Sequence, residues 1–325
     1  MKAILVREFG GPEVLTIGET ADPVPGPGEV LIRVHAAGVN PYETYMRTGT
    51  YAVKPALPYI PGSDAAGVVE AVGAGVTDLA AGTRVYCYGT RDGLIGTYAE
   101  KVVCPRQRVF PLADRVSFAQ GASLGVPYTT AYRALFQRGG AKPGETVLIH
   151  GATGGVGIAA VQLAHHFGMR VIGTGGTARS LEIVRQQGAD VAVSHREQGY
   201  RDEIMRATGG QGVHLVIEMA AHINLNHDLT MLATGGRIVV VGNRGPVEVD
   251  ARHAMNREAA ILGMVVFKAP EADIASAQAA IGAGLRNGTL TPMVRAEMPL
   301  AQAAQAHEAI MGSSDHLVGK IALIP

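Results

Sequence analysis

The segment Thr146–Arg170 constrains the fold more than any other part of the chain. It opens with the apolar run Val147–Ile149, which has the length and β-branched content of a buried parallel strand. A Gly-rich turn follows at Gly151–Gly157, and Ile158–Phe167 has the composition of a helix that ends at Gly168. A strand, a glycine turn and a helix in this order predict the first unit of a doubly wound parallel sheet.

The same turn is a candidate site for the pyrophosphate of a dinucleotide. Written against G-x-G-x-x-G, it has Ala152, Gly154 and Gly157, so alanine replaces the first glycine. Such a turn lets backbone N–H groups approach a pyrophosphate, while the helix N-terminus supplies partial positive charge. The alternative is a turn without a ligand, but the complete strand and helix context favours nucleotide binding. The predicted contacts are Thr153, Gly154, Gly155, Val156 and Gly157.

Composition excludes several other classes of protein. Charged residues make up 17% of the 325 residues and the formal net charge is zero, which argues against a protein held to nucleic acid by phosphate neutralisation. No apolar run reaches 18 residues, and the N-terminus resembles a strand rather than a signal peptide. Cys87 and Cys104 are too few for a disulfide scaffold or a four-cysteine zinc site. We therefore expect a protein of a reducing, cytoplasmic compartment, with no membrane partner.

The pattern of elements predicts two domains. The first 115 residues contain short strands separated by Gly and Pro, whereas from Ser117 onwards strands alternate with helices. The expected strands of the second part are Thr146–His150, Arg170–Thr174, Val191–Ser194, Val213–Glu218, Arg237–Gly242 and Ala260–Phe267. A last strand, Lys320–Ile324, should rejoin the first domain. The prediction is an α/β Rossmann-type domain, residues 119–288, inserted in a β-rich, partly barrelled domain, residues 1–118 plus 289–325.

Several longer segments resemble the medium-chain dehydrogenase/reductases, and most closely their zeta-crystallin-like NADPH:quinone oxidoreductases. These segments are FGGPEVL (9–15), AAGVNPYETYMRTGTY (36–51), LPYIPGSDAAGVVEAVG (57–73), VPYTTAYRAL (126–135), HGATGGVG (150–157) and HEAIMGS (307–313). The resemblance implies a GroES-like catalytic domain and a Rossmann domain for NADPH. It also implies hydride or electron transfer from NADPH to a quinone, and it leaves one-electron and two-electron reduction open.

One departure from the wider family bears on the chemistry. Its zinc alcohol dehydrogenases place a cysteine after the Gly-Val of the second segment and a histidine in a Gly-His-Glu of the third. This chain has Asn40 and Ser63 at those positions. Zinc in proteins takes thiolate, imidazole or carboxylate ligands, which Asn and Ser do not provide. We therefore expect no metal.

The end of the second Rossmann strand favours NADPH over NADH. A carboxylate there would bond the adenosine ribose of NAD, but residues 173–177 contain no acid and Arg179 lies just beyond. A basic side chain pairs with a 2′-phosphate, although Arg179 could also be a solvated charge at a helix start. By resemblance, Gly176 and His195 also border this phosphate.

The remaining site residues rest on the resemblance. It places Tyr45 at the nicotinamide and the substrate, with Asn40 able to bond the acceptor oxygen and Tyr51 near the mouth of the pocket. The alternative for Tyr51 is a core or rim aromatic. Further cofactor positions are Asn224, Val241, Gly242, Asn243, Arg244, Met264, Val265 and Val266, with Val265 and Val266 making contact through their backbone. His165, His166 and His253 lack metal-ligand spacing, which favours structural or surface roles.

We therefore expect a quinone reductase that works in a water-poor cleft between its domains. The nearest alternative is an enoyl-thioester or α,β-unsaturated ketone reductase, for which Tyr45 would be the proton donor. An RNA-binding or structural crystallin-like protein is disfavoured by the zero net charge and the intact glycine turn. The apolar run Ala260–Phe267 reads as an exposed edge strand, which in the family pairs with its copy, so we expect a homodimer or homotetramer.

Overall fold

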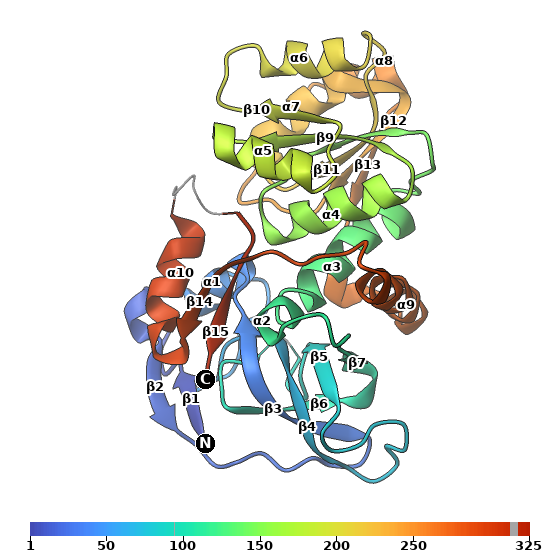
Figure 1. The fold of residues 1–325 in the computed structure, drawn as a ribbon. Coiled ribbons are helices and arrows are strands. Elements are labelled where there is room, and N and C mark those ends of the chain that lie inside the picture. Colours follow the sequence, from blue (N-terminus) through green and yellow to red (C-terminus); the bar gives the residue numbers. More distant parts are fainter. Residues whose placement is uncertain (94, 313–317) are drawn as a thin grey trace. The chain divides into compact units, whose positions relative to one another are not determined.

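The computed structural model describes residues 1–93, 95–312 and 318–325, which divide into two compact units (Figure 1). Unit 1 contains Met1–Val126 and the C-terminal segment from Thr291, including Gly319–Pro325. Unit 2 contains Pro127–Leu290. These units differ from the predicted domain limits by residues 119–126 and 289–290. The proposed limits therefore stay a prediction.

Unit 2 is built on a six-stranded parallel sheet in the order β10-β9-β8-β11-β12-β13. This confirms the predicted doubly wound parallel sheet, whose order reverses between β8 and β11. The strands are β8 (Thr146–Ile149), β9 (Arg170–Gly175), β10 (Val191–Ser194), β11 (Val213–Glu218), β12 (Leu232–Val240) and β13 (Ala260–Gly263).

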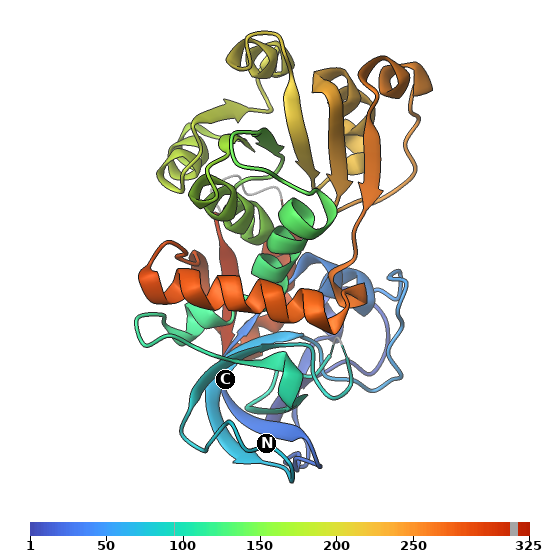
Figure 2. The same ribbon diagram turned by 90° about the vertical axis from the view of Figure 1, so that its right-hand side faces the viewer.

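Helices cover both faces of this sheet, with α4 and α5 on one face and α7 and α8 on the other (Figure 1). The helices are α4 (Gly155–His166), α5 (Ala178–Gln186), α6 (Tyr200–Ala207), α7 (Ala221–Met231), α8 (Ala251–Arg257) and α9 (Glu271–Asn287). Figure 2 shows α9 along its length. Leu148, Ile172 and Val216 from three neighbouring strands are fully buried in one core with Leu229 of α7. The near-continuous apolar strands follow from burial on both faces.

The last strand of the sheet is shorter than the sequence suggested. We expected Ala260–Phe267, but β13 ends at Gly263, which pairs with Val240 at the end of β12. Because β12 offers no partner beyond this point, the chain leaves the sheet and Val266–Lys268 forms a 3-10 helix. The apolar pattern did not reveal this change, because Val, Phe and Met suit a strand and a buried turn equally well.

Unit 1 is built on a seven-stranded sheet in the order β14-β15-β3-β4-β5-β7, with β6 paired to β3. Its strands are β3 (Glu29–Gly38), β4 (Asp64–Val72), β5 (Arg84–Tyr88), β6 (Lys101–Pro105), β7 (Val109–Pro111), β14 (Val294–Pro299) and β15 (Lys320–Ile324). A separate hairpin joins β1 (Lys2–Leu5) to β2 (Thr16–Glu19). The last strand, β15, lies between β14 and β3 and pairs antiparallel with β3, so the end of the chain is an inner strand of this sheet.

The helices of unit 1 are short and lie beside this sheet. They are α1 (Pro41–Arg47), α2 (Phe118–Gly121) and α10 (Ala303–Met311), with 3-10 turns at Pro12–Val14, Arg106–Arg108 and Leu300–Gln302. In the sequence, α3 (Gly125–Tyr132) and a π-helix (Arg133–Arg138) lie between α2 and β8. Gly38 ends β3 where a Cβ would lie 2.0 Å from the carbonyl oxygen of Ala122, so only glycine permits the approach of α2. Among the described residues, no helix combines the length and apolar character needed to cross a membrane.

Candidate active site

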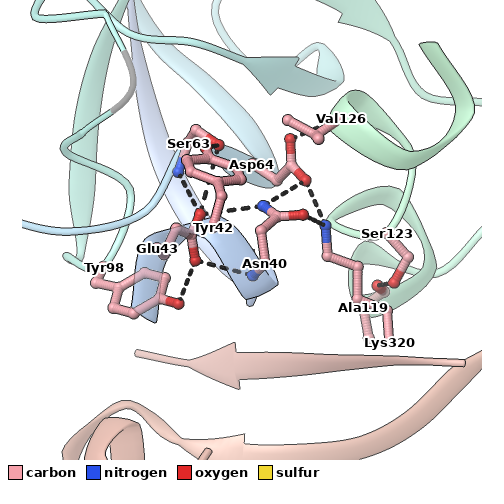
Figure 3. A network of polar contacts seen from close by, with 10 residues as sticks. All are labelled: Asn40, Tyr42, Glu43, Ser63, Asp64, Tyr98, Ala119, Ser123, Val126 and Lys320. Atoms are coloured by element: carbon pink, nitrogen blue, oxygen red, sulfur yellow. Dashed lines mark hydrogen bonds and ion pairs between the residues drawn. The ribbon is translucent and has the colours of Figure 1, made fainter. Parts of the chain in front are cut away.

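A buried ion pair joins three segments of unit 1 (Figure 3). The Lys320 ammonium of β15 donates to Asn40 Oδ1 at 2.8 Å and also bonds Asp64 Oδ2. Asp64 opens β4 and is fully buried, and its second oxygen accepts the Val126 N–H at 2.8 Å. Lys320 is only 4% exposed, so water does little to screen this charge pair. The pair therefore fixes α1, β4 and β15 to one another.

Asn40 is occupied on every polar atom of its side chain. Its Nδ2 donates to Glu43 Oε1 at 3.0 Å and to Asp64 Oδ2 at 3.1 Å, while its Oδ1 accepts from Lys320. A carboxamide has two N–H donors, and both are used here. Asn40 therefore has no N–H left for a substrate oxygen, contrary to the role suggested by the resemblance. Its position at the N-cap of α1, just before Pro41, makes it a residue that orients this helix.

Glu43 lies at the centre of the same network. Its carboxylate accepts from the Asn40 N–H at 2.9 Å, from the Ser63 N–H at 3.2 Å and from the Tyr98 hydroxyl at 2.7 Å. Burial raises the pKa of Glu43, and the hydrogen bonds from Tyr98 and Asn40 oppose that rise. These donors stand in for the water that the carboxylate has lost.

The network continues to α10 through a histidine. The Tyr98 hydroxyl lies 3.1 Å from His307 Nε2, and Arg47 Nη1 lies 3.3 Å from His307 Nδ1. Burial, together with the neighbouring Arg47 guanidinium, lowers the pKa of His307 to about 3. The ring is therefore neutral at physiological pH and ties α1 to α10 without adding a charge.

The tyrosines of residues 36–51 lie on or just after α1. Tyr42 shares a hydrogen bond with the Ser63 hydroxyl, and its ring lies 5.5 Å from that of Tyr51 at a tilt of 36°. Tyr45 is half-buried on the same helix, and its carbonyl accepts from the Thr50 and Tyr51 N–H groups. Sequence reasoning missed Tyr42, although its spacing of three from Tyr45 predicts that both lie on one face of a helix.

These residues do not fit a zinc ion. Asn40 and Ser63 are committed to the hydrogen bonds described above, and the Lys320 ammonium contacts Asn40 Oδ1 directly. A cation bound beside this ammonium would be repelled, and Asn and Ser oxygens are poor zinc ligands. We therefore assign no step of the reaction to a metal at this place.

In unit 2, the glycine turn forms a tight cradle at the start of α4. Gly151 takes the left-handed conformation with φ 58°, which explains why alanine is accepted at position 152. A Cβ on Gly157 would lie 2.2 Å from the Gly151 carbonyl oxygen, whereas a Cβ on Gly154 would meet only that oxygen, at 3.6 Å. Gly154 is the exposed N-cap of the 12-residue helix α4, whose first N–H groups lack helical partners. The geometry fits a dinucleotide pyrophosphate.

Basic residues gather at the ends of β9 and β10. A Cβ on Gly176 would lie 3.2 Å from Arg196 Nε and 3.5 Å from His195 Cε1, so these three residues are neighbours. Arg179 is exposed on the first turn of α5. Sequence reasoning missed Arg196, which could have been found as a second basic residue directly after His195 at the end of a predicted strand.

The other predicted cofactor residues follow β11, β12 and β13. Asn224 Nδ2 donates to Glu218 Oε1 at 3.3 Å, and the N–H groups of Val241 and Gly242 donate to the Glu218 carbonyl. The neighbouring Asn243 and Arg244 lie in the loop after β12, where the Arg244 N–H donates to His222 Nδ1 at 3.2 Å. Beyond β13, Met264 and Val266 are buried, whereas Val265 is 46% exposed.

The turn geometry predicts that two glycine substitutions act differently. In Gly157→Ala the new methyl group overlaps the Gly151 carbonyl, so we expect lower thermal stability and weaker NADPH binding. In Gly154→Ala the methyl group fits but stands on the exposed face of the turn, so binding should weaken at nearly unchanged stability. Melting temperature and NADPH fluorescence titration measure the two effects. Equal loss of stability in both variants would contradict this assignment.

The ion pair predicts a non-additive stability effect. Lys320→Met leaves the buried Asp64 carboxylate without its cation, which should lower the free energy of unfolding by about 3–5 kcal/mol. The double variant Lys320→Met/Asp64→Asn removes both charges and should recover part of this loss. Urea unfolding followed by circular dichroism measures both. A double variant as unstable as the sum of the single variants would show that the two charges do not interact.

Comparisons with known proteins agree with these features. Family models match residues 26–114 as an alcohol dehydrogenase GroES-like domain and residues 155–281 as a zinc-binding dehydrogenase. The rat quinone oxidoreductase is 46% identical over 325 residues, covering 100% of this chain and 98% of its own. A solved NAD-dependent alcohol dehydrogenase superposes with a TM-score of 0.91 at 30% identity, with both chains fully covered.

The Escherichia coli quinone oxidoreductase complexed with NADPH superposes with a TM-score of 0.89 at 29% identity, again with both chains fully covered. The full-length identity to the rat protein decides the branch, because the structural matches include both alcohol dehydrogenases and quinone oxidoreductases. The chain belongs to the zeta-crystallin-like quinone oxidoreductases of the medium-chain dehydrogenase/reductase family.

Proposed function

We propose that the protein is an NADPH-dependent quinone reductase that works without a metal. The observation that carries this proposal is the cluster of Asn40, Asp64 and Lys320, in a chain similar over its whole length to quinone oxidoreductases. NADPH, when bound, supplies a hydride to the quinone. The quinone also takes up one proton, and the product is the hydroquinone.

Unit 2 binds the cofactor in this proposal. The first turn of α4 and the backbone of Gly154–Gly157 receive the pyrophosphate, because that face of the turn is open. Gly176, Arg179, His195 and Arg196 receive the 2′-phosphate. Asn224, the loop Val241–Arg244 and the segment Met264–Val266 receive the nicotinamide end. Charge-assisted hydrogen bonds from arginine favour the phosphorylated cofactor.

Unit 1 binds the acceptor in this proposal. The tilted rings of Tyr42 and Tyr51 offer edges and faces that suit a flat aromatic molecule. Tyr45 directs its hydroxyl to the acceptor oxygen, where negative charge develops as the hydride arrives. Asn40 does not touch the acceptor, and it orients α1 through Glu43 and Asp64.

We also infer that the protein forms at least a homodimer. β13 lies at the edge of the sheet of unit 2, and among the described residues it pairs only with β12. Ile261 on this strand is 45% exposed, so a large apolar side chain stands on the open edge strand. Pairing of β13 with its copy in a second subunit would cover both the open edge of the sheet and the Ile261 side chain. A tetramer would join two such dimers.

We place the protein in the cytoplasm. Cys87 and Cys104 are both buried and both free thiols. Neighbouring reduced thiols are typical of proteins that fold in a reducing compartment.

The basic cluster predicts a preference for NADPH over NADH. Arg179→Ala/His195→Ala should narrow the ratio of the two Kd values, and adding Arg196→Ala should narrow it further. Each lost charge-assisted hydrogen bond weakens NADPH binding by roughly 1.5–3 kcal/mol and leaves NADH binding unchanged. Arg201→Ala, which removes one positive charge on α6, is the matched control. A triple variant with the wild-type preference would show that the phosphate binds elsewhere.

The assignment of Tyr45 predicts different losses for different acceptors. In Tyr45→Phe, reduction of 1,4-benzoquinone and 9,10-phenanthrenequinone should fall modestly, because one hydrogen bond of about 0.5–1.5 kcal/mol is lost. Reduction of crotonyl-CoA, if the enzyme performs it, should fall on the order of a hundredfold, because that reaction needs a general acid. Tyr42→Phe keeps the ring beside Tyr51 and is the control. The measurement is kcat/KM with NADPH.

The same assay tests the proposed function itself. We expect wild-type kcat/KM to be higher for both quinones than for crotonyl-CoA, and to survive treatment with a chelator. A higher value for crotonyl-CoA would favour the enoyl-thioester reductase instead. Near-stoichiometric zinc, with activity lost to the chelator, would contradict metal-independent catalysis.

A further inference from the structure

A second buried polar cluster lies in unit 2, and the proposed reaction does not use it. His150 follows β8 directly, Glu218 ends β11, and Asp228 lies in the middle of α7. His150 Nε2 is 2.9 Å from Asp228 Oδ1 and 3.6 Å from Glu218 Oε2. Both carboxyl groups are fully buried and His150 is 4% exposed. The cluster thus joins two neighbouring strands of the sheet to a covering helix.

This cluster has an excess of acidic groups. Burial lowers the pKa of His150, so its imidazole is neutral and cannot balance a carboxylate. No lysine or arginine forms an ion pair with Glu218 or Asp228 among the described residues. Within the described part of the chain, Glu218 Oε2 and Asp228 Oδ2 have no hydrogen-bond donor, although both atoms are buried. Two bare carboxylates would be very costly here, so protons or a cation must neutralise them.

Protons fit the geometry better than a metal ion does. The three side chains could each offer one ligand atom, and these atoms lie within 4.8 Å of one another. However, ligands around tetrahedral zinc are about 3.3 Å apart at bond lengths near 2.0 Å, and the distance of 2.9 Å from His150 to Asp228 is that of a direct hydrogen bond. The two carboxyl groups each have an oxygen within 4.8 Å of the other, and burial raises the pKa of each group to about 7. Repulsion between like charges this close is relieved when one group keeps its proton.

The cluster is connected to two of the three segments proposed to hold the nicotinamide end of the cofactor. Glu218 Oε1 accepts from the Ala220 N–H and from Asn224 Nδ2. The carbonyl of Glu218 accepts from the N–H groups of Val241 and Gly242. On the other strand, His150 is bonded through its N–H to the Ile217 carbonyl and leads directly into the turn at Gly151. A shift of the Glu218 side chain would therefore move Asn224.

We propose that His150, Asp228 and Glu218 form a proton-sharing triad that positions Asn224 and the Gly151–Gly157 turn for the dinucleotide. In the triad, His150 Nε2–H donates to Asp228, and a proton lies between Asp228 and Glu218. All three are positioning residues, since none touches the reactants. This inference rests on the proposed function, because it assigns the triad to the same cofactor site.

The electrostatic surroundings of the triad are defined by its neighbours. On α6, the Tyr200 phenol interacts electrostatically with both carboxyl groups. The Arg201 guanidinium lies over the Tyr200 ring, 6.0 Å from the ring centroid. On α8, His253 points to Asn226, and Arg257 donates to the Thr230 carbonyl. These groups do not take the place of the shared proton.

The triad predicts a pH dependence with a defined sign. The folded-state pKa values of Glu218 and Asp228 lie above those of free carboxyl groups. The folded protein thus holds protons that the unfolded chain has released, so the contribution of the triad is complete at low pH and is lost as the pH rises through about 7. Above that pH the carboxylates repel each other. The free energy of unfolding should therefore fall, and NADPH binding should weaken, as the pH rises through about 7.

Asp228→Asn separates this effect from other titrations. Its Nδ2 donates to Glu218 at every pH, and its Oδ1 still accepts from His150. Between pH 6.5 and 8.5, we expect the NADPH Kd of the wild type to rise roughly two- to tenfold more than that of Asp228→Asn. Ionisations outside the triad, including that of the 2′-phosphate, are common to both proteins and cancel in this comparison. Asp202→Asn, at an exposed position of α6, is the matched control and should follow the wild type.

Two further measurements complete the test. Guanidinium unfolding at both pH values should show a fall in stability for the wild type and a smaller fall for Asp228→Asn. Asp228→Ala, which cannot bridge His150 and Glu218, should bind NADPH more weakly than wild type at both pH values. Identical pH profiles for wild type and Asp228→Asn would overturn the triad. Stoichiometric zinc in the wild type that is absent from Asp228→Ala would also overturn the triad. By contrast, a wild type that binds no NADPH at any pH would overturn the proposed function, and the positioning role with it.

Discussion

The candidate site of unit 1 depends on the buried pair of Lys320 and Asp64. Removing both charges from water is expensive, and the attraction between them offsets this cost only with good geometry and further hydrogen bonds. Here Asn40 and the Val126 N–H provide those bonds. A pair of this kind is seldom more stabilising than apolar side chains of similar volume. Its value lies in geometry, because it fixes the N-terminus of α1 relative to β4 and β15.

Unit 2 handles buried carboxyl groups in another way. The proposed triad contains no lysine or arginine, so the proton shared by Glu218 and Asp228 reduces the negative charge of the two carboxyl groups. A lysine pair keeps its charge across the physiological range, whereas a shared proton is lost near neutral pH. The proposed acceptor site should therefore be insensitive to moderate pH changes, and the proposed cofactor site should be sensitive to them.

Much of the fold could be predicted because local patterns and the global fold agree. The glycine turn at Gly151–Gly157 and the apolar strands next to it are specified by neighbours in sequence. The contacts around Asn40 are different, since Lys320 is 280 positions away in the chain and nothing local links the two. Position 40 shows the consequence. Resemblance placed it at the reactants, but it is the distant lysine that occupies its carboxamide oxygen.

The same reasoning explains why the triad escaped notice in the sequence. His150 reads as part of a glycine-turn motif, Glu218 as the polar end of a strand, and Asp228 as one polar residue of a helix. Each is ordinary in its local setting, and no motif spacing connects them. Only the parallel pairing of β8 with β11, and the packing of α7 on β11, bring the three together. A buried cluster built by topology in this way costs desolvation energy without adding apolar burial. That cost is understandable where a backbone turn and a side-chain amide must both be positioned for one ligand. Glu218 contacts Asn224 through its side chain and the Val241–Gly242 backbone through its carbonyl.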